Sequence, residues 1–174
     1  MPRTAKLDNA IHFIISRCQP NELGAVKLNK ILWYADVYQF EKCGKTITSD
    51  EHVKQQFGPV PKHVLVSIRE LERTHKIATR ELEYFGKRKR EFWAIQEPDL
   101  TEFSAGEIAI IDQTIEWIKN EHTAQSISDH SRDLVWESAE IGEVIPIGAA
   151  IANRAGEITE EDVKWAFEEL AKAS

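Results

Sequence analysis

Apolar residues recur at helical spacing along most of the chain, and this pattern predicts a fold built mainly from α-helices. The first helix is predicted to begin near Asp8, which we expect to be its N-cap, and to end at Gln19. Pro20 sets that end because a proline disfavours helical geometry at the residue before it. The apolar residues of this helix share one face, which should lie on the core: Ile11, Ile14, Ile15 and Cys18.

The second predicted helix, from about Ala25 to Lys42, is apolar on most of its circumference. A helix with only a narrow polar strip is expected to be buried at the centre of a domain. Gly44 follows it at the position where a left-handed residue ends a helix. Its apolar residues fall into two sets: Leu28, Ile31, Leu32 and Ala35 on one side, and Trp33, Val37 and Phe40 on another.

Two short extended pieces are predicted next, one around Ile47 and one from Val53 to Phe57. The sequence Gly58-Pro59-Val60-Pro61 follows, and its prolines fix the backbone before a helix that should start near Pro61. Four residues are expected to face inward from this helix: Val64, Leu65, Ile68 and Leu71.

A β-hairpin is predicted from the extended pieces Glu83–Phe85 and Phe92–Ile95, with the basic run Gly86–Arg90 at its tip. A further helix should open with Ser104 and Glu107 in capping-box positions, where Phe103 and Ile108 would form a hydrophobic staple.

The C-terminal third of the chain should also be largely helical. Residues 126–152 are expected to be helical in part. A last helix is predicted with Thr159 as its cap and with Ile158 and Val163 as the staple pair. Taken together, the elements indicate an α+β fold, predominantly helical, with a small antiparallel sheet or hairpin. At 174 residues, we expect one domain that spans residues 1–174.

Charge and composition narrow the classes of partner. The net charge of −7 repels a phosphate backbone at long range, so a nucleic-acid partner is disfavoured. No apolar run is long enough to cross a bilayer, which predicts a protein without a membrane partner. Two cysteines are too few for a disulfide scaffold, and this is consistent with a cytoplasmic location.

No motif for catalysis, a metal or a cofactor is evident. The six histidines form no zinc-helix pair, and no phosphate-binding glycine loop is present. Ser128, Asp129, His130 and Ser131 have the residue types of a catalytic triad, but neighbours on a helix point in different directions, so we expect capping and hydrogen bonding instead. Cys43 should be an inert, packed thiol. These observations predict a protein that is not an enzyme.

Two kinds of surface remain as binding candidates. The predicted helix near Pro61 carries basic residues, and the basic hairpin follows it, which is the order of elements in a winged-helix DNA-binding protein. Glutamates on both elements argue against that interpretation. Trp117 and Trp165 lie off the apolar stripes of their helices, where an aromatic side chain either packs at the core edge or anchors a protein partner.

The stretch from Lys27 to Val64 holds Lys27, Leu28, Lys30, Leu32, Tyr34 and Asp36 in the second predicted helix, Gly44 after it, and Phe57, Gly58, Pro59 and Val60 before the next helix. In these residues the chain resembles the Panacea domain family, the SocA-like antitoxins of bacterial and phage toxin–antitoxin systems. A later serine–aspartate–histidine stretch at residues 128–130, followed by Trp136, is similar to a second family segment, although the order of serine and histidine differs. The resemblance covers about residues 7–151. The block from Lys27 to Val64 carries it most specifically.

The resemblance implies a non-enzymatic antitoxin that neutralises a cognate toxin protein by direct binding. Some relatives are thought to present the toxin to a protease, so an adaptor role stays open, as does a homo-oligomer. Tyr34, Gly58 and Pro59 match the family motif, and Trp33, His130 and Trp136 lie in or near matching segments. Together with Trp117 and Trp165 they are the candidate partner-binding residues, although we expect most of them to hold the fold together.

Overall fold

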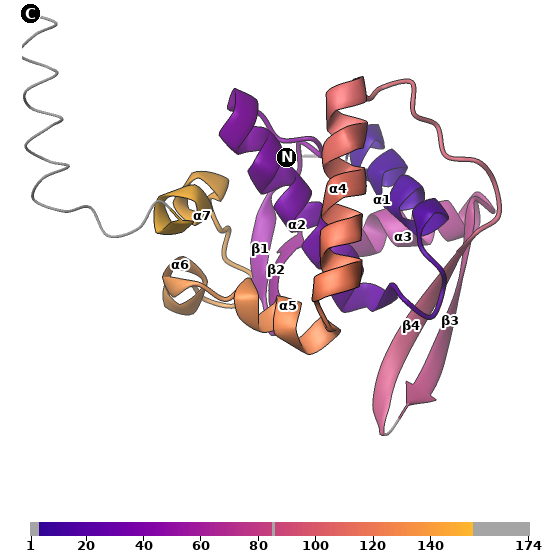
Figure 1. The fold of residues 1–174 in the computed structure, drawn as a ribbon. Coiled ribbons are helices and arrows are strands. Elements are labelled where there is room, and N and C mark those ends of the chain that lie inside the picture. The colour runs from indigo at the N-terminus through magenta and orange to yellow at the C-terminus, as the bar shows by residue number, and fades with distance from the viewer. Residues whose placement is uncertain (1–3, 85, 155–174) are drawn as a thin grey trace, which may run out of the picture.

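Helix α2 (Gly24–Cys43) runs through the middle of the molecule, as Figure 1 shows. It contacts α1, α4, α5 and α7 as well as strands β2 and β4. The helix is buried over most of its length, and this confirms the prediction of a central helix. Gly44 ends it with a φ of 70°, and its N–H donates to the carbonyl oxygen of Phe40.

The structure is a computed structural model that describes residues 4–84 and 86–154. Within these residues it is predominantly helical with two small antiparallel two-stranded sheets, so the predicted α+β class is confirmed. The elements other than α2 are α1 (Ala5–Arg17), β1 (His52–Gln55), β2 (Gly58–Pro61), α3 (Val64–Arg73), β3 (Ile77–Tyr84), β4 (Lys87–Ala94), α4 (Ala105–Glu121), α5 (Ala124–His130), α6 (Leu134–Ser138) and α7 (Ile147–Arg154).

Helix α1 begins earlier than predicted. Its N-cap is Thr4, whose side chain accepts a hydrogen bond from the backbone N–H of Leu7, and the expected cap Asp8 lies in the first turn instead. Asp8 is well placed there because a carboxylate near a helix N-terminus interacts favourably with the helix dipole. The helix ends at Arg17, with Cys18 as its C-cap, and its apolar face is buried as predicted.

The segment after Gly44 differs from the prediction in three respects. Residues around Ile47 form no strand, although the Ile47 side chain is buried. The Gly-Pro-Val-Pro run is itself strand β2, which pairs with β1, and α3 therefore begins at Val64. Leu65 is 57% exposed, because the buried face of α3 consists of Val64, Ser67, Ile68 and Leu71. Proline is tolerated in a two-stranded ribbon of this kind, where one edge needs no N–H donor.

The predicted hairpin is confirmed, but its strands are longer and its turn is tighter. β3 and β4 pair from Ile77 opposite Ala94 to Tyr84 opposite Lys87. Residues 87–90 therefore belong to strand β4, and the prediction that the basic run forms the tip is wrong. A pattern of consecutive charged residues hides a strand because it lacks the alternation of apolar and polar positions.

Helix α4 has the predicted capping box, with Ser104 and Glu107 bonded reciprocally. The predicted helical character of residues 126–152 is confirmed in α5, α6 and α7. The last predicted helix, with Thr159 and Trp165, lies outside the described residues. None of the described helices combines the length and the hydropathy that a membrane span requires.

Candidate functional site

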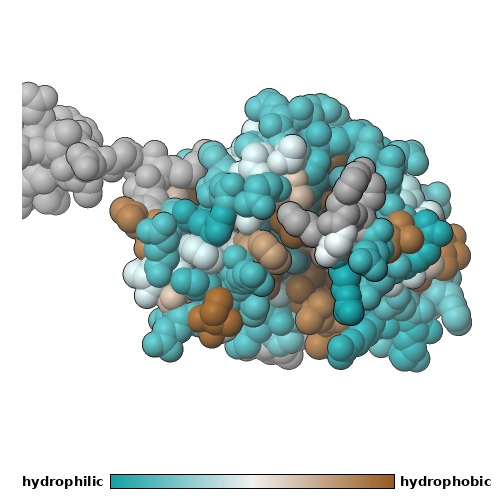
Figure 2. Space-filling view, turned by 90° about the horizontal axis from the view of Figure 1, so that it is seen from below, coloured by the Kyte–Doolittle hydropathy of each residue, from teal (hydrophilic) through white to brown (hydrophobic). Residues whose placement is uncertain are grey.

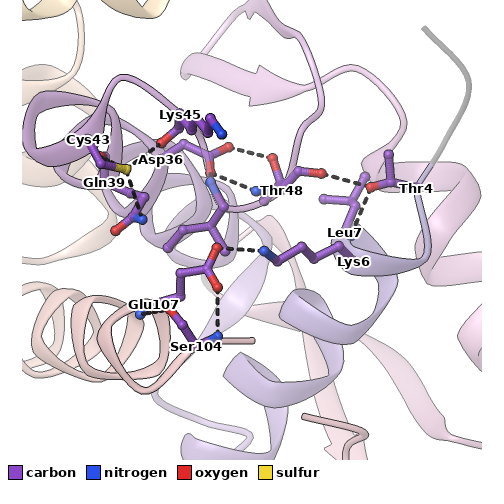
Figure 3. Close-up of polar contacts among 11 residues, drawn as sticks. Thr4, Lys6, Leu7, Asp36, Gln39, Cys43, Lys45, Thr48, Ser104 and Glu107 are labelled. Carbon is purple, nitrogen blue, oxygen red and sulfur yellow. Dashed lines mark hydrogen bonds and ion pairs between the residues drawn. The ribbon is translucent and has the colours of Figure 1, made fainter. Parts of the chain in front are cut away.

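A buried carboxylate on α2 organises the loop that follows the helix. Asp36 is fully buried, and its Oδ1 accepts hydrogen bonds from the backbone N–H groups of Ile47 (2.7 Å) and Thr48 (2.9 Å). The Thr48 hydroxyl donates to Oδ2 of the same side chain. Thr4, the cap of α1, donates its hydroxyl to the carbonyl oxygen of Thr48 at 2.7 Å (Figure 3). One carboxylate thus joins α2 to the loop, and the loop to the start of α1.

A second buried carboxylate extends this set of bonds to α3. Asp50 is 5% exposed and accepts from both the backbone N–H (2.9 Å) and the ring Nδ1 (2.7 Å) of His63, the residue before α3. The backbone N–H of Asp50 in turn donates to the Thr48 hydroxyl. Asp36, Thr48, Asp50 and His63 therefore link α2, the loop after it and the start of α3.

Lys30, which belongs to the family motif as Asp36 does, is 1% exposed. Its Nζ donates to the carbonyl oxygen of Pro59 at 2.8 Å and so ties strand β2 to α2. Gly58 makes this close approach feasible: its φ is +105°, and a Cβ there would lie 2.4 Å from Lys30 Nζ and 2.3 Å from Ser131 Oγ. Only glycine suits that combination of backbone angle and crowding.

The serine–aspartate–histidine stretch is hydrogen-bonded to the turn between β1 and β2. Ser128 Oγ donates to the carbonyl oxygen of Phe57 at 3.0 Å, and Ser131 Oγ donates to the carbonyl oxygen of Ser128. Both serines are buried. The expectation that this stretch serves capping and hydrogen bonding, and not a triad, agrees with these bonds.

Burial shifts the pKa of three ionisable groups in this core. Desolvation raises the pKa of Asp36 to about 7, against the hydrogen bonds from Thr48 and Ile47, which lower it. Desolvation lowers the pKa of Lys30 to about 7, with a further contribution from the charge of Arg132. It also lowers the pKa of His52 to about 3, with help from the charge of Lys30.

His52 and Asp36 would be the strongest candidates for chemistry in this core. Their Nε2 and Oδ2 atoms lie 3.8 Å apart, and the His52 ring packs edge-on against Trp33 at 5.0 Å between centroids. Both side chains are closed to solvent, so a substrate could not reach them in this conformation. Perturbed pKa values are found at structural sites as well as at functional ones. We therefore interpret the buried polar residues as a scaffold.

A second group of residues lies at the surface, where α2, α4 and α5 meet. We call Tyr34, Tyr38, Trp117, His122 and His130 the aromatic cluster. Trp117 is at its centre, with its ring centroid 5.1 Å from that of Tyr34, 4.9 Å from that of His122 and 5.8 Å from that of His130. Tyr34 is buried, His130 is exposed, and the other members are half-buried. Edge-to-face contacts of this kind stabilise aromatic pairs beyond the area that they bury.

Beside the aromatic cluster the surface is hollowed. The hollow has a volume of about 310 Å³ and is lined by Tyr38, Ile110, Gln113, Thr114 and Trp117. A concave surface edged by tyrosine and tryptophan is the type of place where protein partners insert anchor residues. The geometry suits recognition of another molecule, and none of the residues that line it is a carboxylate, histidine, lysine or cysteine.

Three of the eight predicted partner-binding residues meet in the aromatic cluster: Tyr34, Trp117 and His130. Trp33 is only 2% exposed, and Gly58 and Pro59 are also buried, so these three cannot touch a partner in this conformation. Trp136 lies elsewhere, half-buried, where its Nε1 donates to the carbonyl oxygen of Gln55 and Lys54 Nζ lies 4.2 Å from its ring centroid. Trp165 lies outside the described residues.

Large apolar side chains are exposed at several points along the described chain. On the face drawn in Figure 2, hydrophobic residues lie in separate areas among hydrophilic ones. Large hydrophobic residues that are exposed singly are normal on soluble proteins. Among residues 4–84 and 86–154, those that are exposed are Phe57, Leu65, Val66, Ile95, Leu134, Ile141 and Val144.

The prediction that Cys43 is a packed thiol is wrong, because its side chain is exposed. Its place in the last turn of α2 follows the helical period, but residues 41–43 at the end of that helix all lie at the surface. The thiol is hydrogen-bonded to Gln39. Among the described residues, no group of three or more histidines, cysteines and carboxylates is arranged to hold a metal ion.

Two members of the aromatic cluster, Tyr38 and His122, were not among the residues predicted from the sequence. Tyr38 lies four residues after Tyr34, so both tyrosines share one face of α2, and that spacing could have linked them. His122 directly follows α4 as its C-cap and lies five residues after Trp117. No pattern within one helix would have assigned it, because its contact with His130 depends on how α5 folds back.

Comparison with known proteins agrees with the motif. A family model described as antitoxin SocA-like, Panacea domain, matches residues 28–137. This range is narrower than the resemblance noted above and begins inside α2. It contains Lys30, Asp36, Gly58 and all members of the aromatic cluster. No curated protein and no solved structure matches the chain.

Replacing Gly58 by alanine should destabilise the protein by about 3 kcal/mol, because the new Cβ adds a clash with Lys30 and Ser131 to the strain of a positive φ. Gly44→Ala is the matched control: Gly44 also has a positive φ, but nothing lies within 4 Å of its added Cβ. The control should cost only about 1 kcal/mol. Chemical denaturation measures both, and equal losses would contradict the crowding at Gly58.

The buried Lys30 should make stability depend on alkaline pH. Its pKa of about 7 in the folded protein lies below the unfolded value of 10.5, so the unfolded chain binds a proton at this residue more readily. The stability that the neutral Lys30 contributes is therefore present in full above pH 10.5 and is lost as the pH falls from 10.5 through 7. Between pH 8 and 9 this one group should add about 1.4 kcal/mol of unfolding free energy per pH unit. Lys30→Met should reduce the slope by that amount in denaturant titrations. A slope unchanged by the substitution would show that Lys30 is charged in the folded protein.

Proposed function

Because the chain belongs to the family of SocA-like antitoxins with a Panacea domain, we propose that it neutralises a cognate toxin protein by binding it directly at the aromatic cluster. Family membership suggests an antitoxin in a toxin–antitoxin system and a non-enzymatic role. The finer statement, direct binding at this surface, is supported by the place where Tyr38, Trp117 and His130 meet. Such a protein would act in the cytoplasm, beside its toxin.

One observation carries this proposal: aromatic side chains from three helices converge at the surface beside a hollow of about 310 Å³. Tryptophan and tyrosine are enriched among the few residues that supply most of the binding energy of an interface. Their rings are already held in place by one another, so little side-chain entropy would be lost when a partner binds. The hollow could receive one or two side chains, while the remaining interface would extend over α2 and α4.

DNA binding is the main alternative, and the ion pairs of α3 and the hairpin argue against it. Arg73 pairs with Glu70, Arg80 with Glu91, and Arg90 with Glu81. Basic side chains that are already neutralised by carboxylates release few counterions from DNA and so contribute little affinity. We therefore place direct protein binding ahead of a winged-helix regulator.

We expect the growth arrest caused by the toxin-like product of a neighbouring reading frame to be relieved by co-expression of this protein. Trp117→Ala should abolish the rescue, and His130→Ala, at an exposed position, should weaken it. Trp136→Ala, which removes a half-buried tryptophan on another surface, should leave the rescue intact. If Trp136→Ala abolishes the rescue and Trp117→Ala does not, the interface lies near Trp136 and not at the aromatic cluster, while direct neutralisation still holds.

The same cells distinguish inhibition from presentation to a protease. If binding alone neutralises the toxin, the half-life of the toxin in a translation-arrested culture should be the same or longer when the antitoxin is present. Purified antitoxin should then also inhibit the purified toxin without any third component. A toxin half-life that shortens with the antitoxin, together with no inhibition by the purified pair, would replace direct neutralisation by an adaptor role.

A further inference from the structure

Helix α6 is rich in apolar residues, but none of its five residues is buried. Its sequence is LVWES, and Leu134 at its start is 72% exposed. Val135 and Trp136 pack only partly against the core, and Ile141, shortly after the helix, is 66% exposed. A surface helix normally turns its apolar residues toward another element. Within residues 4–84 and 86–154, the Leu134 side of α6 has no element that covers it.

The chain leaves the described residues beside this helix. α7, which ends at Arg154, contacts α6, and Figure 1 shows the two next to each other at one side of the fold. The stretch before α7 is held on β1, because the N–H of Gly142 donates to the carbonyl oxygen of Lys54 and the N–H of Ile145 to that of His52. The segment after Arg154 therefore starts from a helix whose position next to α6 is set by the fold.

The twenty residues after α7 lie outside the described residues, but their sequence predicts an amphipathic helix that begins after Thr159. Val163, Phe167 and Leu170 recur at helical spacing and share one face, whereas Glu168 lies on the opposite side. A single helix of about 14 residues is marginal in water unless its apolar face is packed against another element. This segment therefore needs a surface to cover.

An apolar surface without cover and an amphipathic helix without a surface thus follow each other in one chain. Residues 155–158 connect them, and four residues span up to roughly 13 Å when extended. A short tether of this kind gives the attached segment an effective concentration in the millimolar range. A second copy or another protein would have to reach the same surface from free solution. The tether therefore favours the chain's own C-terminal segment as the occupant.

Charges on both sides are compatible with this contact. Lys54 Nζ is bonded to the carbonyl oxygens of Glu137 and Ala139 and lies 4.2 Å from the ring centroid of Trp136. No carboxylate of the described residues forms an ion pair with it. The Glu137 side chain is exposed, and Lys164 of the predicted helix offers it a partner. The first turn of that helix supplies three carboxylates for Lys54: Glu160, Glu161 and Asp162.

We propose that residues 155–174 form a helix that packs its apolar face, Val163, Phe167 and Leu170, against Leu134 on the outer side of α6. The contact would remove from water apolar groups that both elements otherwise expose. Trp165 lies two residues after Val163 and so on the far side of the docked helix, where it would be displayed at the surface. The contact is separate from the aromatic cluster, and the inference does not depend on the proposed function.

A photo-crosslinking residue in the full chain identifies what covers α6. With benzoylphenylalanine in place of Leu134, irradiation of the purified protein should join residue 134 to a peptide from residues 159–173, at the mass of one chain. The same replacement of Leu65, which is 57% exposed on α3, is the control and should give no such peptide. A product at the mass of two chains would assign the surface to a second copy. That result, or no cross-link to residues 155–174, would overturn the proposal.

Amide hydrogen exchange tests the contact from the other side. Phe167→Ser removes the largest apolar group of the proposed face, so the amides of α6 should exchange roughly tenfold faster than in the unchanged protein. Glu168→Ser, on the opposite side of the predicted helix, is the matched control and should leave their exchange as it is. Equal exchange of the α6 amides in the two variants would show that this face does not cover α6, and the proposal would be wrong.

Discussion

The placement of ionisable groups inside the apolar centre of the protein is the constraint on which the rest of the structure depends. Lys30 and Asp36 lie on the central helix, where apolar residues surround them, and neither reaches solvent. A buried polar group is costly unless it is hydrogen-bonded, so each must find a partner on a neighbouring segment. Asp36 finds backbone N–H groups in the loop after α2, and Lys30 finds the carbonyl oxygen of Pro59. These bonds give the irregular path between α2 and α3 a single conformation, which apolar packing alone would specify less well.

That path determines where the surface residues lie. The turn between β1 and β2 is held by Lys30 from α2 and by Ser128 from α5, so it fixes α5 relative to the central helix. His130 is two residues beyond Ser128, and its ring therefore meets Tyr34 and Trp117. The buried polar residues thus hold α5 in the position that lets the aromatic cluster form outside them. The inner layer is closed to solvent, and the outer one is available for recognition.

Much of the fold could be predicted from the sequence, and the exceptions have physical causes. The central helix, its end at Gly44 and the capping box of α4 depend on local rules, and these predictions are confirmed. The N-cap of α1 and the start of α3 were wrong because they depend on distant partners: Thr4 bonds to Thr48, and the two prolines belong to a strand that pairs with β1. For the candidate site, Tyr34, Trp117 and His130 were singled out separately, but the sequence could not show that they meet. Gly58 and Pro59, which match the family motif, and Trp33, which lies in a matching segment, were grouped with them, and only the three-dimensional structure shows that these three are internal.

The burial of Gly58 and Pro59 affects how genetic screens of this protein should be interpreted. A selection for clones that no longer protect the host would recover substitutions at both positions, because they collapse the fold and remove the protein from the cell. Such hits would map onto the family motif and would look like contact residues. Only a parallel measurement of abundance for every clone would separate them from surface substitutions that leave the protein intact.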